Sequence, residues 1–178
     1  MLLLLSIVFS LSNCVEETAI IKKESSFFDL KNYFETQQAI LSKLKRVIKI
    51  ATIDGKHVEK ELDSLDFNEE LKVFEASDIN KVAWMDKYQV DSIFDENGML
   101  DQIVYKATDE KLRTQQLSVS FDQNEVDTIE IFNNSSSGVA KLQQHLLYIP
   151  NSGYRIESTQ KTTFSEEHVV TVDVQFLK

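Results

Sequence analysis

The chain is poor in the residues that most binding and catalytic motifs require. Cys14 is its only cysteine, so no disulfide bond can form within a subunit and stability must come from the folded core. Its four glycines are scattered and cannot form the loops that cradle phosphate groups. The three histidines show no metal-ligand spacing, and the sequences His-Glu-x-x-His and Gly-x-Ser-x-Gly are missing.

These absences exclude the common catalytic and metal-binding motifs. A site assembled from residues distant in sequence would leave no such trace, but no positive sign of one is present. We therefore assign no catalytic, cofactor-binding or metal-binding residue, and we expect a protein that is not an enzyme and needs no cofactor.

Positive charge is also in short supply. The chain has 19 Lys and Arg residues against 29 Asp and Glu residues, which gives a formal net charge of −10 at pH 7. The two signs are interspersed, as is typical of a solvated surface. The negative excess disfavours nucleic-acid phosphates and anionic lipid headgroups as general partners, so we expect no nucleic acid to be bound.

Long apolar runs are missing too. The N-terminal run, residues 2–11, is about half the length of a membrane-spanning helix, which needs about 20 residues. Such a run is typical of a cleaved signal peptide. It closes on Leu11-Ser12-Asn13-Cys14, which resembles the bacterial lipobox, where a branched apolar residue stands three places before the cysteine.

The lipobox resemblance implies that residues 1–13 are a signal peptide and that Cys14 is the lipid attachment residue. Its sulfur would carry a diacylglyceryl thioether, and its freed amine often carries an acyl chain as well. The alternative is an ordinary signal peptide with a cysteine nearby by chance. Because no Lys or Arg precedes the apolar run, a true start upstream of Met1 is a further alternative.

Acylation would make the membrane the first partner of this protein. Each buried methylene contributes about 0.8 kcal/mol, so two or three chains on Cys14 hold a protein essentially permanently. Residues 14–25 are then the lipidated cysteine and a tether, and residues 26–178 a single domain. Glu16 and Glu17 resemble the surface-display signal of Bacteroidetes lipoproteins, or are part of a solvated linker. We expect an outer-membrane lipoprotein of the cell envelope, with the periplasmic or surface face left open.

Two helices are predicted in the first half of the domain. Apolar residues at spacings of three and four predict a helix over residues 27–45, with Ser26 and Asp29 as capping residues. A second helix is expected over residues 67–77, capped by Asp66. The apolar face of the first helix consists of Phe27, Leu30, Phe34, Ile40, Leu41, Leu44 and Ile48, and that of the second consists of Phe67, Leu71 and Phe74.

Strands dominate the rest of the chain. Asp54-Gly55 and Asn97-Gly98 each separate two β-prone runs and predict tight hairpin turns. Beyond Tyr88, apolar and polar residues alternate, which indicates antiparallel strands with one packed face and one solvated face. The segment 139–149 fits a short helix or a strand, because Leu142, Leu146 and Tyr148 suit either period; we choose a strand.

The predicted fold is α+β, with two N-terminal helices packed on a twisted antiparallel meander of about seven to eight strands. The segments that carry a family resemblance are Phe27-Phe28, Asp54-Gly55-Lys56, Phe74 to Lys81, Trp84 and Tyr148 to Tyr154. This order is similar to that of small lipoproteins of Bacteroidetes for which no activity is known. The resemblance would span most of residues 14–178 and implies location and fold, but no mechanism.

Three polar clusters are explained as turns. Glu166-Glu167-His168 is the nearest approach to an acid–base cluster, but neighbouring side chains on a strand point to opposite faces. Residues 95–98 and 122–125 carry clustered oxygen ligands, yet neither has the alternating acidic pattern of a calcium loop. We interpret all three as solvated turns.

Two roles are compatible with these features. Trp84, Tyr88 and Tyr148 suit a recognition surface, although aromatic residues at a helix-to-sheet junction are more typical of a core. We expect a non-enzymatic binding or structural role towards an envelope protein or another envelope component. The alternative is a carrier or sensor of an apolar ligand held between the helices and a curved sheet.

Overall fold

The computed structural model describes residues 27–177. The signal peptide 1–13, the lipid attachment residue Cys14 and the tether 14–25 therefore lie outside the described residues, and their assignments stay predictions. The proposed cap at Ser26 also lies outside the described residues and stays a prediction.

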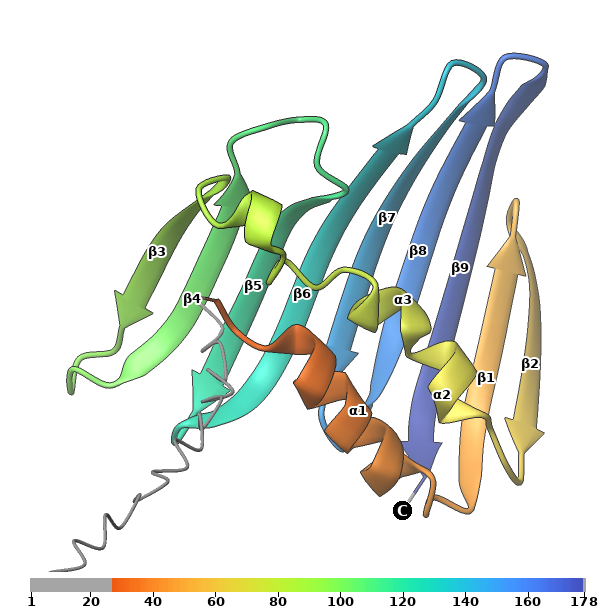
Figure 1. The fold of residues 1–178 in the computed structure, drawn as a ribbon. Coiled ribbons are helices and arrows are strands. Elements are labelled where there is room, and N and C mark those ends of the chain that lie inside the picture. The colour runs from red at the N-terminus through yellow and green to blue at the C-terminus, as the bar shows by residue number, and fades with distance from the viewer. Residues whose placement is uncertain (1–26, 178) are drawn as a thin grey trace, which may run out of the picture.

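The described chain is an α+β domain, as expected, built as one sheet with helices on a single face (Figure 1). It contains four helical segments and nine strands in the described range. The helices are α1 (Leu30–Leu41), α2 (Phe67–Glu70), α3 (Lys72–Glu75) and the 3-10 helix η1 (Val82–Trp84). The strands are β1 (Arg46–Ile53), β2 (Lys56–Leu62), β3 (Tyr88–Phe94), β4 (Leu100–Ala107), β5 (Thr114–Asp122), β6 (Glu125–Ser136), β7 (Ala140–Ile149), β8 (Gly153–Thr162) and β9 (Ser165–Leu177).

All strand pairs are antiparallel, and the sheet order is β2-β1-β9-β8-β7-β6-β5-β4-β3. Strands β3 to β9 form the expected meander, and the β1–β2 hairpin joins it at β9, with Val47 opposite Phe176. The expected seven to eight strands were too few. Strand β8 is the hardest to detect, because Tyr154 and Ile156 are its only apolar side chains.

The first helix is shorter than predicted. It begins after Asp29, whose side chain accepts a hydrogen bond from the Asn32 N–H at 3.1 Å, and it ends at Leu41 rather than at residue 45. Phe27 and Leu44 lie outside the helix but still pack against the core. The apolar spacing therefore continued through flanking segments, and this explains the overestimated length.

The second predicted helix, over residues 67–77, is instead two four-residue helices, α2 and α3, so the expectation of two N-terminal helices was wrong in the length and continuity of the second. Asp66 caps α2 as predicted, accepting from the Asn68 and Glu69 N–H groups. Leu71, at φ −89° and ψ −3°, interrupts the helical geometry between α2 and α3, but it is fully buried. Packing against the core, rather than a continuous helix, determines the conformation of this segment.

The Asp54-Gly55 turn and the strand chosen for residues 139–149 agree with the structure, whereas Asn97-Gly98 lies in a longer connection, residues 95–99, where Asn97 lacks the positive φ of a tight two-residue turn. Asp54 and Gly55 both have positive φ, at 47° and 83°, as a tight two-residue hairpin turn requires. The segment 139–149 is strand β7 rather than a helix.

Aromatic contacts join the helices to the centre of the sheet. The Phe34 ring of α1 lies 5.1 Å from the Tyr148 ring of β7 and 4.9 Å from the Phe74 ring of α3, measured between centroids. All three side chains are fully buried. The hydroxyl of Tyr148 donates to Gln37 Oε1 at 2.8 Å, so the same contact carries a satisfied polar group.

A second contact ties α2 to the sheet. The hydroxyl of Tyr154 donates to Glu70 Oε2 at 2.6 Å, and Lys49 Nζ donates to Glu70 Oε1 at 2.6 Å. Burial, followed by the contact with Glu70, raises the pKa of Tyr154 far above its ordinary value. Of the aromatic residues considered for recognition, Tyr88 and Tyr148 are core residues, whereas Trp84 is half-buried with Lys81 Nζ 3.8 Å from its ring centre.

We expect Phe34→Ala to lower the free energy of unfolding by about 3–5 kcal/mol, because it removes a fully buried aromatic ring and leaves a cavity. Urea denaturation of the variant measures this loss. The exposed neighbour Glu35 is the control, and Glu35→Ala should change stability by no more than about 0.5 kcal/mol. A loss below about 1 kcal/mol for Phe34→Ala would show that α1 does not pack on the sheet as described.

Candidate functional site

The face of the sheet opposite the helices is covered by no described helix (Figure 1). Side chains alternate along each strand, so the neighbours of buried residues point to this face. Leu146 and Tyr148 of β7 are fully buried under the helices, which places Leu147 and Ile149 on the opposite side. We call this surface, over β6 to β9, the free face.

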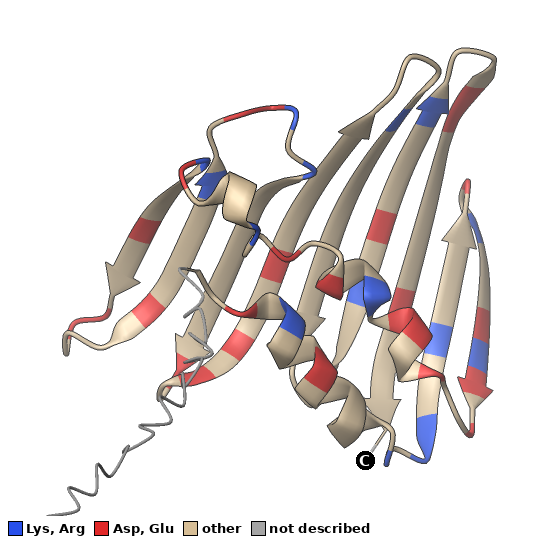
Figure 2. Cartoon of the chain, in the orientation of Figure 1, with Lys and Arg blue, Asp and Glu red and all other residues tan. Residues whose placement is uncertain are grey.

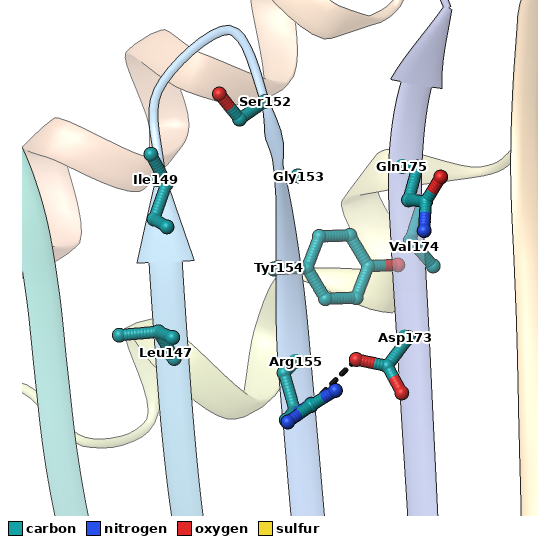
Figure 3. Close-up of a pocket in the computed structure, with 9 residues that line it drawn as sticks. All are labelled: Leu147, Ile149, Ser152, Gly153, Tyr154, Arg155, Asp173, Val174 and Gln175. Atoms are coloured by element: carbon teal, nitrogen blue, oxygen red, sulfur yellow. Dashed lines mark hydrogen bonds and ion pairs between the residues drawn. The ribbon is translucent and has the colours of Figure 1, made fainter.

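An apolar hollow of about 340 Å³ lies on the free face near the β7–β8 turn (Figure 3). Leu147 and Ile149 line it from β7, and Ile149 is 38% exposed. Its other lining residues come from β8, from β9 and from Ser152 in the turn between β7 and β8. An exposed Leu–Ile pair beside an open depression can contact an apolar group of a partner.

Gly153 creates the floor of this hollow. Its φ is +154°, and an added Cβ would lie 2.0 Å from the carbonyl oxygen of Val174, so β8 and β9 approach too closely there for a side chain. Gly153 pairs with Ile149 on one side and Gln175 on the other. The close approach of β9 therefore requires glycine at this position.

An ion pair borders the hollow. Arg155 Nε lies 2.5 Å from Asp173 Oδ1, and the two residues are directly opposite each other on β8 and β9 (Figure 3). The hydrogen bond to Asp173 raises the pKa of Arg155. Because the Arg155 side chain is 55% exposed, the pair contributes little to stability but presents oriented donors and acceptors at the rim.

An aromatic–imidazole stack occupies the next row of the free face. The rings of Phe132 and His145 are parallel within 7°, with centroids 4.4 Å apart, and the two residues are opposite each other on β6 and β7. His145 Nε2 lies 2.7 Å from Glu130 Oε1; because a carboxylate only accepts, this nitrogen carries the proton. Phe132 is 39% exposed, an unusual exposure for a stacked aromatic ring in mid-strand.

A second hollow, of about 240 Å³, lies beside this stack. Most of its lining residues are of polar types, and they include Asn134, His145, Glu157 and Thr159 beside Phe132. The side-chain carbonyl oxygen of Asn134 is buried and has no hydrogen-bond partner in the described chain. Because the atom has almost no accessible surface, this unpaired oxygen costs free energy but offers no acceptor to an outside donor.

The two hollows form one continuous surface because cross-strand pairing links them. Leu147 is opposite Arg155, and His145, two residues earlier on β7, is opposite Glu157. Lys and Arg residues are interspersed with Asp and Glu residues along the strands and helices (Figure 2). The arrangement is suited to binding a partner that has both apolar and polar groups. Within residues 27–177, no group of three His, Cys, Asp or Glu side chains could hold a metal ion.

Of the three clusters interpreted as solvated turns, residues 166–168 lie instead in strand β9, and the other two lie at turns. His168 Nδ1 lies 2.9 Å from Asp54 Oδ2, which joins β9 to the β1–β2 turn, and this hydrogen bond lowers the pKa of Asp54. Asp95 accepts hydrogen bonds from the Asn97 and Met99 N–H groups and closes the β3–β4 turn. Residues 122–125 lie in the β5–β6 turn.

Sequence reasoning missed the residues of the free face. One signal was present: Leu146-Leu147-Tyr148-Ile149 is apolar at every position, so both faces of β7 carry apolar side chains at this end. The same run made the segment 139–149 ambiguous. The stack of Phe132 and His145 depends on strand pairing, which the order of residues does not reveal.

We expect Gly153→Ala to lower the free energy of unfolding by at least about 2 kcal/mol, because the new Cβ must displace the backbone of β9. Gly138→Ala is the matched control, since an added Cβ there meets open space and should cost no more than about 0.5 kcal/mol. Thermal and urea unfolding compare the two variants. Equal stability of both would contradict the close approach of β8 and β9.

No helix in residues 27–177 is long and apolar enough to cross a membrane. No protein family, curated protein or solved structure matches the chain.

Proposed function

We propose that this protein is a non-enzymatic lipoprotein of the cell envelope, tethered to the outer membrane by acyl chains on Cys14. The observation that carries the proposal is Leu11-Ser12-Asn13-Cys14, in which the only cysteine follows directly on an apolar leader. The role of the domain is to bind another envelope component or an envelope protein. It needs no cofactor and contacts no nucleic acid.

The free face is the proposed binding surface. It combines an apolar hollow at Leu147 and Ile149 with an exposed aromatic stack and the Arg155–Asp173 pair. Apolar anchors beside oriented polar groups are typical of recognition surfaces.

The place where the described chain begins is compatible with the free face as the binding surface. Phe27, the first described residue, packs edge-on against Tyr88 and Tyr105, with ring centroids 5.8 and 5.5 Å away, and its N–H donates to Asn80 Oδ1 at 3.1 Å. These are residues of the helix-covered side. The chain therefore enters the domain away from the free face and leaves that face accessible.

The alternative function is a carrier or sensor of an apolar ligand held between the helices and the sheet. It would need space at their junction, where Phe34, Phe74 and Tyr148 contact one another and are fully buried. A hollow of about 340 Å³ beside α1, lined by Tyr33, Ile40 and Val126 among others, is the place where such a ligand would enter. The filled junction favours the free face over this alternative.

We expect Cys14→Ser to abolish incorporation of a radiolabelled or alkyne-tagged fatty acid and to leave an unprocessed or soluble precursor, because no other thiol can accept the diacylglyceryl group. Metabolic labelling and membrane fractionation measure both effects. Retention of the label and of membrane association in this variant would rule out attachment at Cys14.

We expect a photoreactive amino acid at Gln143, on the free face, to crosslink a discrete partner in intact cells. The same group at Glu35, an exposed residue of α1, should not. The additional change Phe132→Ala should reduce the Gln143 adduct several-fold without changing the amount of folded protein, because Phe132 is exposed. Adducts at Glu35 but not at Gln143 would place the binding surface on the helices instead.

A further inference from the structure

Two hairpins, β6–β7 and β8–β9, extend beyond the helices and end beside each other (Figure 1). Each carries an exposed apolar residue near its end. We define the hairpin ends as residues 136–141 between β6 and β7 and residues 161–165 between β8 and β9. Phe164 is 90% exposed and Val139 is 60% exposed. The two ends are joined, because the N–H of Thr163 donates to the carbonyl oxygen of Val139 at 3.0 Å.

The exposed pair does not stabilise the domain. A phenylalanine that keeps 90% of its surface in water gains almost nothing from folding. Isolated exposed apolar residues need no explanation, but two of them at the outermost points of joined hairpins form a patch. Such a patch suits insertion into an apolar surface beyond the end of the sheet.

The charges beside the patch are paired in an unusual way. Lys141 on β7 and Lys161 on β8 are directly opposite each other, and neither forms an ion pair with a described residue. Like charges in this position repel each other unless an anion lies between them. Both line a hollow of about 260 Å³ at the hairpin ends. On β9, next to Lys161, stand the exposed carboxylates of Glu166 and Glu167.

Two adjacent cations beside an exposed carboxylate on the neighbouring strand, below an apolar tip, complement a zwitterionic phospholipid headgroup. The lysines match its phosphate, and the glutamate that shares their face of the sheet matches its ammonium group. An anionic lipid surface would instead be repelled by the net charge of −10. We propose that the hairpin ends dock on a zwitterionic phospholipid bilayer, with Phe164 and Val139 inserted at the boundary of headgroups and acyl chains.

The tether is long enough for this contact and acylated Cys14 to share one bilayer. Tyr105, against which Phe27 packs, lies in one cross-strand row with Leu117, Ile131, Leu146 and Ile156. The path from Tyr105 crosses four strand spacings to Ile156 and then follows the chain for eight residues to Phe164. This gives a separation of about 30 Å between Tyr105 and Phe164. The 13 residues 14–26 span up to about 45 Å when extended. Docking goes beyond the proposed function, and its evidence in the hairpin residues does not depend on acylation.

The test places a polarity-sensitive, thiol-reactive dye at Thr163→Cys in the full chain, which keeps Phe164 intact. Because Cys14 is the only native cysteine, acylation leaves the new thiol as the single labelling site. Asn97→Cys, in the β3–β4 turn, is the matched control. In vesicles of phosphatidylcholine and phosphatidylethanolamine we expect a blue-shifted emission at residue 163, quenched by brominated acyl chains, and an unshifted emission at residue 97.

Variants of the hairpin ends make the proposal falsifiable. Two double variants, Val139→Ser with Phe164→Ser and Lys141→Glu with Lys161→Glu, should each abolish the blue shift. When the hairpin ends are unchanged, the shift should persist in excess inorganic phosphate. Equal emission at residue 163 with and without vesicles, or an equal shift at residue 97, would overturn the docking proposal. If the wild-type chain takes up dye, Cys14 is free. The labelling variants are then made in a chain that also carries Cys14→Ser, and this chain is added to the vesicles.

Discussion

The aromatic contact between α1 and the middle of the sheet is the constraint on which the rest of the structure depends. Phe34, Phe74 and Tyr148 meet there without exposed surface, and no cross-link supplements them, because the chain has one cysteine. Short helices can cover only one face of a nine-stranded sheet. The burial of these rings therefore determines which half of the strand residues forms the core and which half stays accessible.

This one-sided cover explains the character of the free face. On the solvated face of an antiparallel sheet, the residues out of phase with the core are mostly polar. On β7 they include Leu147, Ile149 and His145, and on β6 they include Phe132. The antiparallel register brings these residues into adjacent rows with the Arg155–Asp173 pair, so a surface with mixed chemistry arises from side chains that stabilise the core very little.

Much of the fold could be predicted from local signals, and the site could not. Asp54-Gly55 determines its turn by backbone geometry alone, and the alternation of Val170, Val172, Val174 and Phe176 indicates a half-buried strand. The length of α1 was overestimated because Phe27 and Leu44 enter the core from outside the helix. The pairing of β1 with β9 and the Phe132–His145 stack depend on register between distant segments, which periodicity does not encode.

The central claim is that one face of the sheet packs the domain together and the other binds a partner. Hydroxyl-radical footprinting, read by mass spectrometry on purified protein and on intact cells, tests both halves at once. The account predicts that Phe34 and Tyr148 resist oxidation in both samples, whereas Phe132 and Leu147 are oxidised in the purified protein and protected in cells. Equal oxidation of Phe132 and Leu147 in the two samples, or ready oxidation of Tyr148 in the purified protein, would contradict it.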